Sequence, residues 1–357
     1  MSISKNLHAL EDNSKRHSFI MPKKILFINN KGGVGKTTIA FNTACKLAQK
    51  GYKTCIVDLD PECNTTMSIV GNEEDNGDLF RQSYASQNPK TIYEIIKLQI
   101  EGTGDVIYDE KPKMIQDNLF LIAGDLSMSL FEESASNAYT QAASGQILGF
   151  RIITAVERYI NSIGRDMEID FFIMDTSPSL GMMNRLFLLG ADHFVVPVLS
   201  DAYSFQGVEN LGTVLSRWKE EWKLIKQSVV KARAIPSDLV FDGDPRCLGY
   251  ISNKLKPYAK AQTKAQKYWA EKIEESSQKN LTIHSNKISN LSIKIIDLAD
   301  YGTLMNESQK NNKAIFDLTT QDTTQINLGG SKELLLKSSE EFEELANSII
   351  NRLELNF

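Results

Sequence analysis

Residues 31–37, Lys-Gly-Gly-Val-Gly-Lys-Thr, combine three glycines with lysine and a hydroxyl residue in one short segment. An apolar run at 23–30 precedes it and helical apolar spacing at 38–50 follows it, so the segment joins a predicted strand to a predicted helix. Glycines let backbone N–H groups curve around an anion, and a helix N-terminus adds partial positive charge. We therefore predict a phosphate site in which Lys36 reaches the β- and γ-phosphates, Thr37 ligates Mg²⁺, and the cradle comprises Gly32, Gly33, Val34, Gly35, Lys36, Thr37 and Thr38.

Three aspartates stand at the ends of two further predicted strands. Asp58 and Asp60 end the run 53–60, and their alternation places both on one face of the strand end. Asp175 ends the apolar run 170–175. Ligand sites of parallel sheets lie at the carboxyl ends of the strands, which favours a role for these acids beside phosphate and Mg²⁺. The alternatives are solvated strand-end acids and, for Asp175, a capping role.

The glycine loop departs from the general phosphate-loop pattern in an informative way. That pattern has glycine six residues before its lysine, whereas this chain has Asn30 there and an additional Lys31. The segment resembles the deviant Walker A loop, KGGxGK(S/T), of the ParA/MinD group of ATPases. This resemblance implies ATP and Mg²⁺ as cofactors and a homodimer in the ATP state, in which Lys31 reaches the partner's nucleotide. A second cation there would neutralise charge that develops as the γ-phosphoryl group leaves.

The stretch that holds the first two aspartates carries the same resemblance. Residues 58–64, Asp-Leu-Asp-Pro-Glu-Cys-Asn, are similar to the DxDPQGN element of the family, with Glu62 and Cys63 replacing Gln and Gly. By that resemblance Asp60 orients the attacking water and Asp58 helps to hold the magnesium shell. The glycine lost at Cys63 removes backbone freedom from this loop.

The third aspartate belongs to an element with a family counterpart as well. Residues 175–181, Asp-Thr-Ser-Pro-Ser-Leu-Gly, resemble the Walker B and switch II element DTPPSLG, with Ser177 in place of a proline. The resemblance implies that Asp175 binds Mg²⁺ through water. It extends from Lys23 to Asp322 and is closer to the ParA partition ATPases than to MinD.

The elements around these motifs define an α/β fold. A strand, the glycine loop, a helix and a second strand form a βαβ unit, which requires a parallel sheet. The family resemblance implies a P-loop NTPase with a mostly parallel, twisted sheet and helices on both faces. The remaining patterns predict strands at 119–123, 170–175, 193–198, 247–253 and 293–297, and helices at 91–100, 147–163, 183–190, 204–227, 258–279 and 332–355.

Composition and domain organisation agree with a globular protein. The chain has 357 residues, a net charge of −5, 41% hydrophobic and 24% charged residues. We predict a polar tail over 1–20 and one ParA-like ATPase domain over 21–357, with insertions near 70–90, 133–146 and 236–246 and with mobility at 134–144. No apolar run reaches the roughly 18–20 residues of a membrane span, and the four cysteines form no CxxC pair, which together predict a cytoplasmic protein.

Two features of the second half of the chain could bind ligands. A lysine stripe would lie along one helix face and could contact DNA phosphates, although a solvated face explains it too; its members are Lys256, Lys260, Lys264 and Lys267. Asn253 ends a predicted strand, where related folds use an asparagine to contact adenine, and a helix-capping or strand-ending role is equally compatible. The last predicted helix carries an apolar stripe but six acids and three bases over 331–357, so we expect it to pack on the domain rather than on lipid.

Together these observations predict an ATP-dependent dimerising switch that hydrolyses ATP slowly. In the family, the ATP dimer binds DNA nonspecifically and a ParB-like or other partner protein stimulates hydrolysis, which would partition or position a cargo near the nucleoid. Two alternatives use the same ATPase: a nucleotide-gated regulator of protein assembly without DNA binding, and a MinD-like membrane-associated ATPase.

Overall fold

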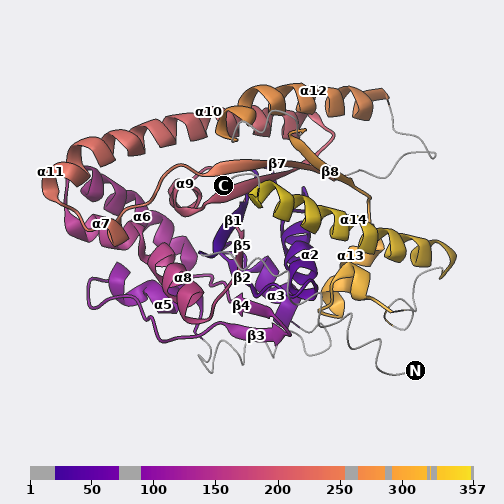
Figure 1. Ribbon diagram of the computed structural model, residues 1–357, viewed down its shortest axis with the longest axis horizontal. Coiled ribbons are helices and arrows are strands. Elements are labelled where there is room, and N and C mark those ends of the chain that lie inside the picture. The colour runs from indigo at the N-terminus through magenta and orange to yellow at the C-terminus, as the bar shows by residue number, and fades with distance from the viewer. Residues whose placement is uncertain are drawn as a thin grey trace.

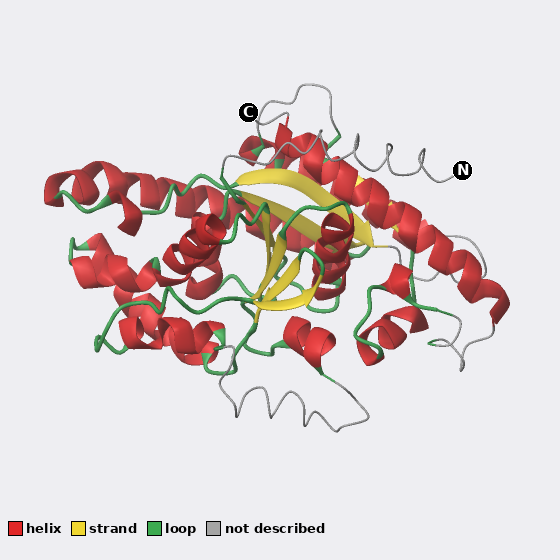
Figure 2. Cartoon of the chain, turned by 60° about the horizontal axis from the view of Figure 1, so that its bottom comes forward, coloured by secondary structure: helices red, strands yellow, loops and turns green. Residues whose placement is uncertain are grey.

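A single eight-stranded sheet organises the chain in the computed structural model, which describes residues 21–71, 90–253, 264–285, 292–319, 322 and 328–354. The strand order is β3-β4-β2-β5-β1-β6-β7-β8, and Figure 2 shows the twisted sheet with helices on either side. The strands are β1 (Lys23–Phe27), β2 (Thr54–Asp58), β3 (Lys113–Gln116), β4 (Leu119–Ile122), β5 (Phe171–Asp175), β6 (His193–Leu199), β7 (Arg246–Asn253) and β8 (Lys294–Leu298).

All neighbouring strands pair in parallel except β3 and β4, which are antiparallel. The chain therefore crosses from one strand to the next through helices, as a parallel sheet requires. Every residue of β2 and β5 is buried, which explains why these strands are continuous apolar runs rather than alternating ones. The predicted α/β class and mostly parallel sheet are confirmed.

One face of the sheet is covered by α2 (Lys36–Gln49), α3 (Asn64–Val70), α13 (Thr303–Lys310) and α14 (Leu328–Glu354). Figure 1 shows α14 lying beside α2, and the two helices contact each other. Phe342 and Leu345 of α14 are buried in the same apolar cluster as Ile25 and Ile173 of the sheet. The prediction that the acidic terminal helix packs on the domain is therefore confirmed.

The opposite face carries the helices α5 (Ile92–Ile100), α6 (Met128–Ala143), α7 (Ile147–Ile153), α8 (Ala155–Asp166), α9 (Met182–Gly190), α10 (Ala202–Ile225) and α12 (Lys264–Asn280). Their second core includes Leu26, Phe172 and Trp222. Beyond α10 the chain continues through a π-helical turn at Lys226–Val230 into α11 (Lys231–Arg233), at the left of Figure 1. Helices thus cover both faces, as predicted.

The structure corrects the prediction of a mobile segment at 134–144. These residues belong to α6 up to Ala143, and Ala135, Ala138 and Ala142 are buried in the core. Small and polar residues look like a loop in sequence, but their small side chains allow α6 to pack closely against α7 and α9. The composition of 134–144 predicted a loop because the packing of α6 against other helices cannot be seen in its own residues.

Other differences concern element boundaries. The single helix predicted at 147–163 is two helices, α7 and α8, which meet at Thr154, where the hydroxyl donates to the Phe150 carbonyl at 2.7 Å. The elements β3, α3 and α13 were not predicted. Within the insertion near 236–246 the structure has a short 3₁₀ turn at Ser237–Leu239. The tail at 1–20, most of the insertion at 70–90 and the start of the predicted helix at 258–279 lie outside the described residues.

No helix in the described ranges is long and apolar enough to span a bilayer.

Candidate functional site

The carboxyl edge of the sheet brings the three sequence motifs together. In the strand register, Asp175 at the end of β5 pairs with Phe27 of β1 on one side and with Asp58 of β2 on the other. The glycine loop follows β1, so Asp175 lies between this loop and the chain that leaves β2. This arrangement confirms that the glycine loop and the two strand-end acids share one edge, as the βαβ pattern predicted.

The glycine loop has a backbone that other residues could adopt only with strain. Gly33 and Gly35 have φ angles of +73° and +83°, and Gly35 is the N-cap of α2. A Cβ atom on Gly35 would lie 2.6 Å from Nδ2 of Asn253, which donates a hydrogen bond to the Val34 carbonyl at 3.2 Å. Asn253 therefore braces the loop from the end of β7, and its contact with adenine stays a prediction.

Lys36 and Asp175 form a buried ion pair at the centre of the site. The Lys36 Nζ lies 2.6 Å from Oδ1 of Asp175 and also donates to the Thr176 carbonyl. Asp175 is 0% exposed and Lys36 7% exposed, so neither charge is compensated by solvent. The Thr37 hydroxyl donates to the second carboxylate oxygen at 2.7 Å. Three predicted site residues thus converge without an intervening side chain.

A fourth residue at this centre was missed by the sequence reasoning. Thr65, at the start of α3, donates its hydroxyl to Oδ2 of Asp175 at 2.7 Å. The available signal was the Asn-Thr-Thr stretch directly after the second strand motif. The chemistry of this donor set fits Mg²⁺, which prefers hard oxygen ligands and keeps several waters. Among the described residues no group of three or more His, Cys, Asp or Glu could hold a metal ion.

Asp58 is fully buried, and its carboxylate accepts hydrogen bonds from Thr66 of α3. One oxygen accepts from the Thr66 N–H at 2.8 Å and from the Thr66 hydroxyl at 2.7 Å, and the other accepts from the Asp60 N–H at 3.2 Å. Burial and the neighbouring Asp175 charge raise the pKa of Asp58 to about 7. These contacts support a role in positioning α3, while the predicted place in the magnesium shell stays a prediction.

Asp60 lies at the turn between β2 and α3. Its carboxylate accepts from the Glu62 N–H at 3.0 Å, and the residue is buried. Burial raises the pKa of Asp60, against the opposing effects of the Glu62 hydrogen bond and the Lys36 charge. The following Cys63 has a φ of +55°, in the left-handed region, and is the N-cap of α3. The position where the family element has glycine therefore keeps a glycine-like backbone in this chain.

Lys31 is held by its own chain. Its ammonium group pairs with the Asp201 carboxylate and lies 5.9 Å from the centre of the Tyr203 ring. The same carboxylate caps α10 by accepting from the Ser204 N–H at 2.8 Å. Asp201 was not singled out by sequence, although an aspartate directly before a helix is a cap signal. The reach of Lys31 to a second chain stays a prediction.

The predicted lysine stripe is only partly within the described residues. Lys264 and Lys267 occupy the first turn of α12 and are exposed. Lys256 and Lys260 lie outside the described residues, so the stripe as a whole stays a prediction.

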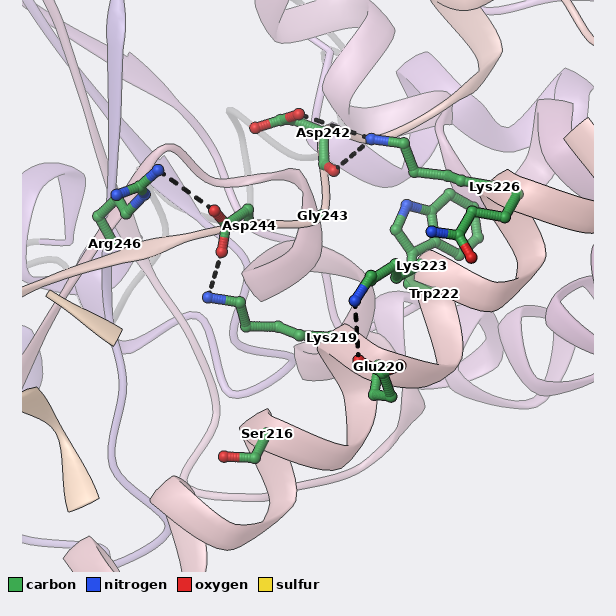
Figure 3. Close-up of a pocket in the computed structure, with 11 residues that line it drawn as sticks. Ser216, Lys219, Glu220, Trp222, Lys223, Lys226, Asp242, Gly243, Asp244 and Arg246 are labelled. Atoms are coloured by element: carbon green, nitrogen blue, oxygen red, sulfur yellow. Dashed lines mark hydrogen bonds and ion pairs between the residues drawn. The ribbon is translucent and has the colours of Figure 1, made fainter. Parts of the chain in front are cut away.

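A cavity of about 670 Å³ lies far from the glycine loop, at the amino edge of the sheet (Figure 3). It is bounded by α10 and by the chain that enters β7. Lys219 pairs with Asp244, which is also 3.3 Å from Arg246, and the Lys226 ammonium is 3.6 Å from Asp242. These cations on the lining thus face carboxylates of the chain that leads into β7.

The fold and the loop together define a P-loop NTPase. The chain matches the AAA_31 family, an AAA domain, over residues 22–229, which is more than half of its length. It therefore belongs to this family, and its similarity to Soj and ParA proteins places it among the ParA/MinD-type ATPases with a deviant Walker A loop. The resemblance in the sequence motifs is confirmed.

Similar proteins include the chromosome partitioning protein ParA of Myxococcus xanthus. It is 29% identical over 196 residues, which are 52% of this chain and 56% of that protein. The alignments with the first three curated relatives span 66%, 53% and 64% of those relatives' own length.

Two solved structures share the fold over nearly the whole chain. Protein DIP2308 from Corynebacterium diphtheriae has a TM-score of 0.66 at 25% identity and covers 94% of this chain and 100% of that one. The ATP complex of a Cyanothece McdA variant has a TM-score of 0.58 at 16% identity, with 92% and 96% coverage. At that identity McdA supports the fold alone.

Proposed function

We propose that this protein is an ATP-dependent dimerising switch that hydrolyses ATP slowly and binds DNA nonspecifically, and so partitions or positions a plasmid, chromosome or other cargo. The observation that carries the proposal is the convergence of Lys36, Thr37 and Thr65 on Asp175, beside a loop in which two of the three glycines have left-handed backbone angles. Membership of the ParA/MinD-type family supports it.

Each site residue has a task in this proposal. Lys36 leaves Asp175 to bind phosphate oxygens, and Thr37 and Asp175 then hold Mg²⁺, which neutralises phosphate charge when bound. Asp60 holds the attacking water, and its raised pKa makes it a better proton acceptor than an exposed aspartate. Lys31 leaves Asp201 to complete the site of the second chain. The backbone of residues 32–35 donates N–H groups to the phosphates.

The cargo and partner parts of the proposal depend on the relatives. ParA of M. xanthus is named a chromosome partitioning protein, which supports a partition or positioning role here. Lys264 and Lys267 offer exposed cations for DNA phosphates. A ParB-like or other partner protein would stimulate hydrolysis and release the DNA.

The nucleotide part is tested by phosphate release and by sedimentation with a nonhydrolysable ATP analogue. Wild-type protein should hydrolyse ATP with Mg²⁺ and sediment as a dimer with the analogue. Asp60→Ala should keep ATP and the dimer but lose hydrolysis, because only the water-positioning carboxylate is removed. A wild-type protein that stays monomeric with the analogue, or normal turnover by Asp60→Ala, contradicts the proposal.

The DNA part is tested by retention on a filter at two salt concentrations. Retention should require ATP, weaken at higher salt, and fall in Lys264→Glu and in Lys267→Glu, made as separate single variants. Lys279→Glu is the control, since it introduces the same charge at an exposed position near the other end of α12. Wild-type protein that retains no DNA with ATP favours the nucleotide-gated assembly regulator instead. Equal retention by all variants would overturn the assignment of DNA binding to Lys264 and Lys267, and ATP-independent retention would contradict the nucleotide switch.

A further inference from the structure

The segment 176–181, which links Asp175 to α9, is held at both ends by other parts of the chain. At its first end the Thr176 carbonyl accepts from the Lys36 ammonium, and the Thr176 hydroxyl donates to the Phe27 carbonyl at 3.1 Å. In its middle Asn184 donates to the Ser177 and Ser179 carbonyls at 2.8 and 2.9 Å. The contacts at the other end of the segment, at Gly181, determine how far the segment can rearrange when Lys36 moves.

Glu132 of α6 holds the far end. One oxygen of its carboxylate accepts from the Met182 N–H at 2.6 Å, and the other accepts from the Met183 N–H at 2.9 Å. These are the first two residues of α9, and the N-cap Gly181 has no side chain to bind them. A carboxylate is suited to this place, because a helix N-terminus carries partial positive charge and its first N–H groups have no partner within the helix.

The absence of a side chain at Gly181 allows the Glu132 carboxylate to approach the N-terminus of α9. Its φ of −74° is available to any residue, so backbone freedom does not require glycine here. A Cβ atom would instead lie 2.6 Å from Oε1 of Glu132, which is too close for any real contact. The neighbouring Glu133 is exposed, so the close approach is particular to Glu132.

We propose that Glu132 is a positioning residue for ATP hydrolysis, an inference that rests on the proposed function. Glu132 anchors the Gly181 end of the segment on α6, which is itself packed in the core through Met128 and Phe131. When Lys36 leaves the Thr176 carbonyl for phosphate, the first end of the segment loses one contact and keeps the one between the Thr176 hydroxyl and the Phe27 carbonyl. The Glu132 contact fixes the other end at Gly181, which limits how far the segment beside the nucleotide site can rearrange.

The test compares Glu132→Gln with Glu133→Gln, which make the same change in charge at adjacent positions of α6. We expect the kcat of Glu132→Gln to fall on the order of tenfold with KM for ATP within twofold of wild type, because an NH2 group, which cannot accept from an N–H, replaces one of the two accepting oxygens. Glu133→Gln should keep both constants. Binding of a fluorescent ADP analogue, measured well below the melting temperature, should be equal in all three proteins.

A second variant keeps the inference testable if Glu132→Gln does not fold. Gly181→Ala should displace the same carboxylate and lower kcat by a similar factor. The double variant Glu132→Gln/Gly181→Ala should lose no more than the worse single variant, since both changes break one contact. Multiplicative losses would show two unrelated effects and overturn the inference.

The outcomes separate this inference from the proposed function. If wild type hydrolyses ATP and Glu132→Gln does so equally fast, the positioning role is wrong and the proposed function stands. A kcat loss accompanied by an equal loss of nucleotide binding would show general damage to the site and also overturns the role. If wild type neither binds nor hydrolyses ATP, the proposed function fails and the inference fails with it.

Discussion

Asp175 illustrates at the residue scale how a buried charge constrains its neighbours. The carboxylate is 0% exposed, and it is satisfied by the Lys36 ammonium and by the hydroxyls of Thr37 and Thr65. Removing one partner of a buried ion pair leaves a charge without compensation. The residues that bind phosphate in our proposal therefore also stabilise the fold when no phosphate is bound.

Lys36→Ala should for this reason lower the free energy of unfolding by about 3 kcal/mol in the absence of nucleotide. The double variant Lys36→Ala/Asp175→Asn should recover most of that loss, because it removes the uncompensated charge. Urea unfolding of the three proteins checks this. Equal stability of Lys36→Ala and wild type would show that solvent reaches the carboxylate, contrary to its burial.

Cys63 provides a second residue-scale prediction. Its left-handed backbone, with φ of +55°, costs a residue that carries a Cβ about 1 kcal/mol or more relative to glycine. The free energy of unfolding of Cys63→Gly, measured with urea, should therefore be about 1 kcal/mol higher than that of Cys63→Ala. Both variants lose the buried thiol, so this loss does not contribute to the difference. Alanine normally stabilises a helix more than glycine does. A Cys63→Ala variant more stable than Cys63→Gly would therefore show that the backbone at this position is not strained.

At the scale of elements, the N-terminus of α10 is coupled to the glycine loop. The Asp201 carboxylate caps this helix by accepting from the nearby Ser204 N–H, and it also pairs with Lys31, which is distant in sequence. Asparagine caps helices as well as aspartate does, which allows the two contacts to be separated. Replacing Asp201 with asparagine keeps the cap and removes only the charge.

Asp201→Asn should bind MgATP about two- to fivefold more tightly than wild type, because a partly buried ion pair no longer competes for Lys31. Titration with a fluorescent ATP analogue measures this. Glu220→Gln, an exposed charge change further along α10, is the control and should bind as wild type does. Unchanged or weaker binding by Asp201→Asn would contradict the competition.

The loop before β7 shows how one glycine lets two elements meet. Gly243 has a φ of +75°, and a Cβ atom there would collide with the indole ring of Trp222, which is almost fully buried (Figure 3). Gly243→Ala should cost roughly 2–4 kcal/mol, from strain and overpacking together. Gly102→Ala, with φ of +70° and open space, should cost only about 1 kcal/mol. Denaturant unfolding followed by tryptophan fluorescence checks both, and equal costs would exclude the collision.

The whole molecule has two apolar layers around one sheet, and its amino edge carries a buried histidine. Burial, with smaller contributions from Lys23 and Arg246, lowers the pKa of His193 to about 3. The unfolded chain therefore binds a proton between about pH 6.5 and pH 3 that the folded chain does not bind. In this window the histidine's contribution makes the fold less stable as the pH falls.

Wild type should accordingly lose about 2 kcal/mol more stability between pH 7 and pH 5 than His193→Gln, which has no proton to take up. Urea unfolding at the two pH values measures the difference. Parallel pH dependence of the two proteins would show that His193 can be protonated in the folded state.

Much of this protein is determined by its sequence alone. The glycine loop, the apolar strands and the order of strand, loop, helix and strand predicted the parallel sheet and placed Lys36, Thr37 and Asp175 at one edge. These features are local, because backbone freedom and apolar periodicity are properties of neighbouring residues. Parallel pairing then brings the strand ends together whatever the remaining contacts are.

Only the tertiary structure decided the contacts between distant segments. Thr65 reaches Asp175 from 110 residues away, and Lys31 reaches Asp201 from 170 residues away. The contact between Glu132 and the first N–H groups of α9 and the helical state of 134–143 likewise depend on which elements the sheet order places side by side. Sequence spacing carries little information about such contacts, because the strand order and helix packing of the whole chain determine which side chains meet.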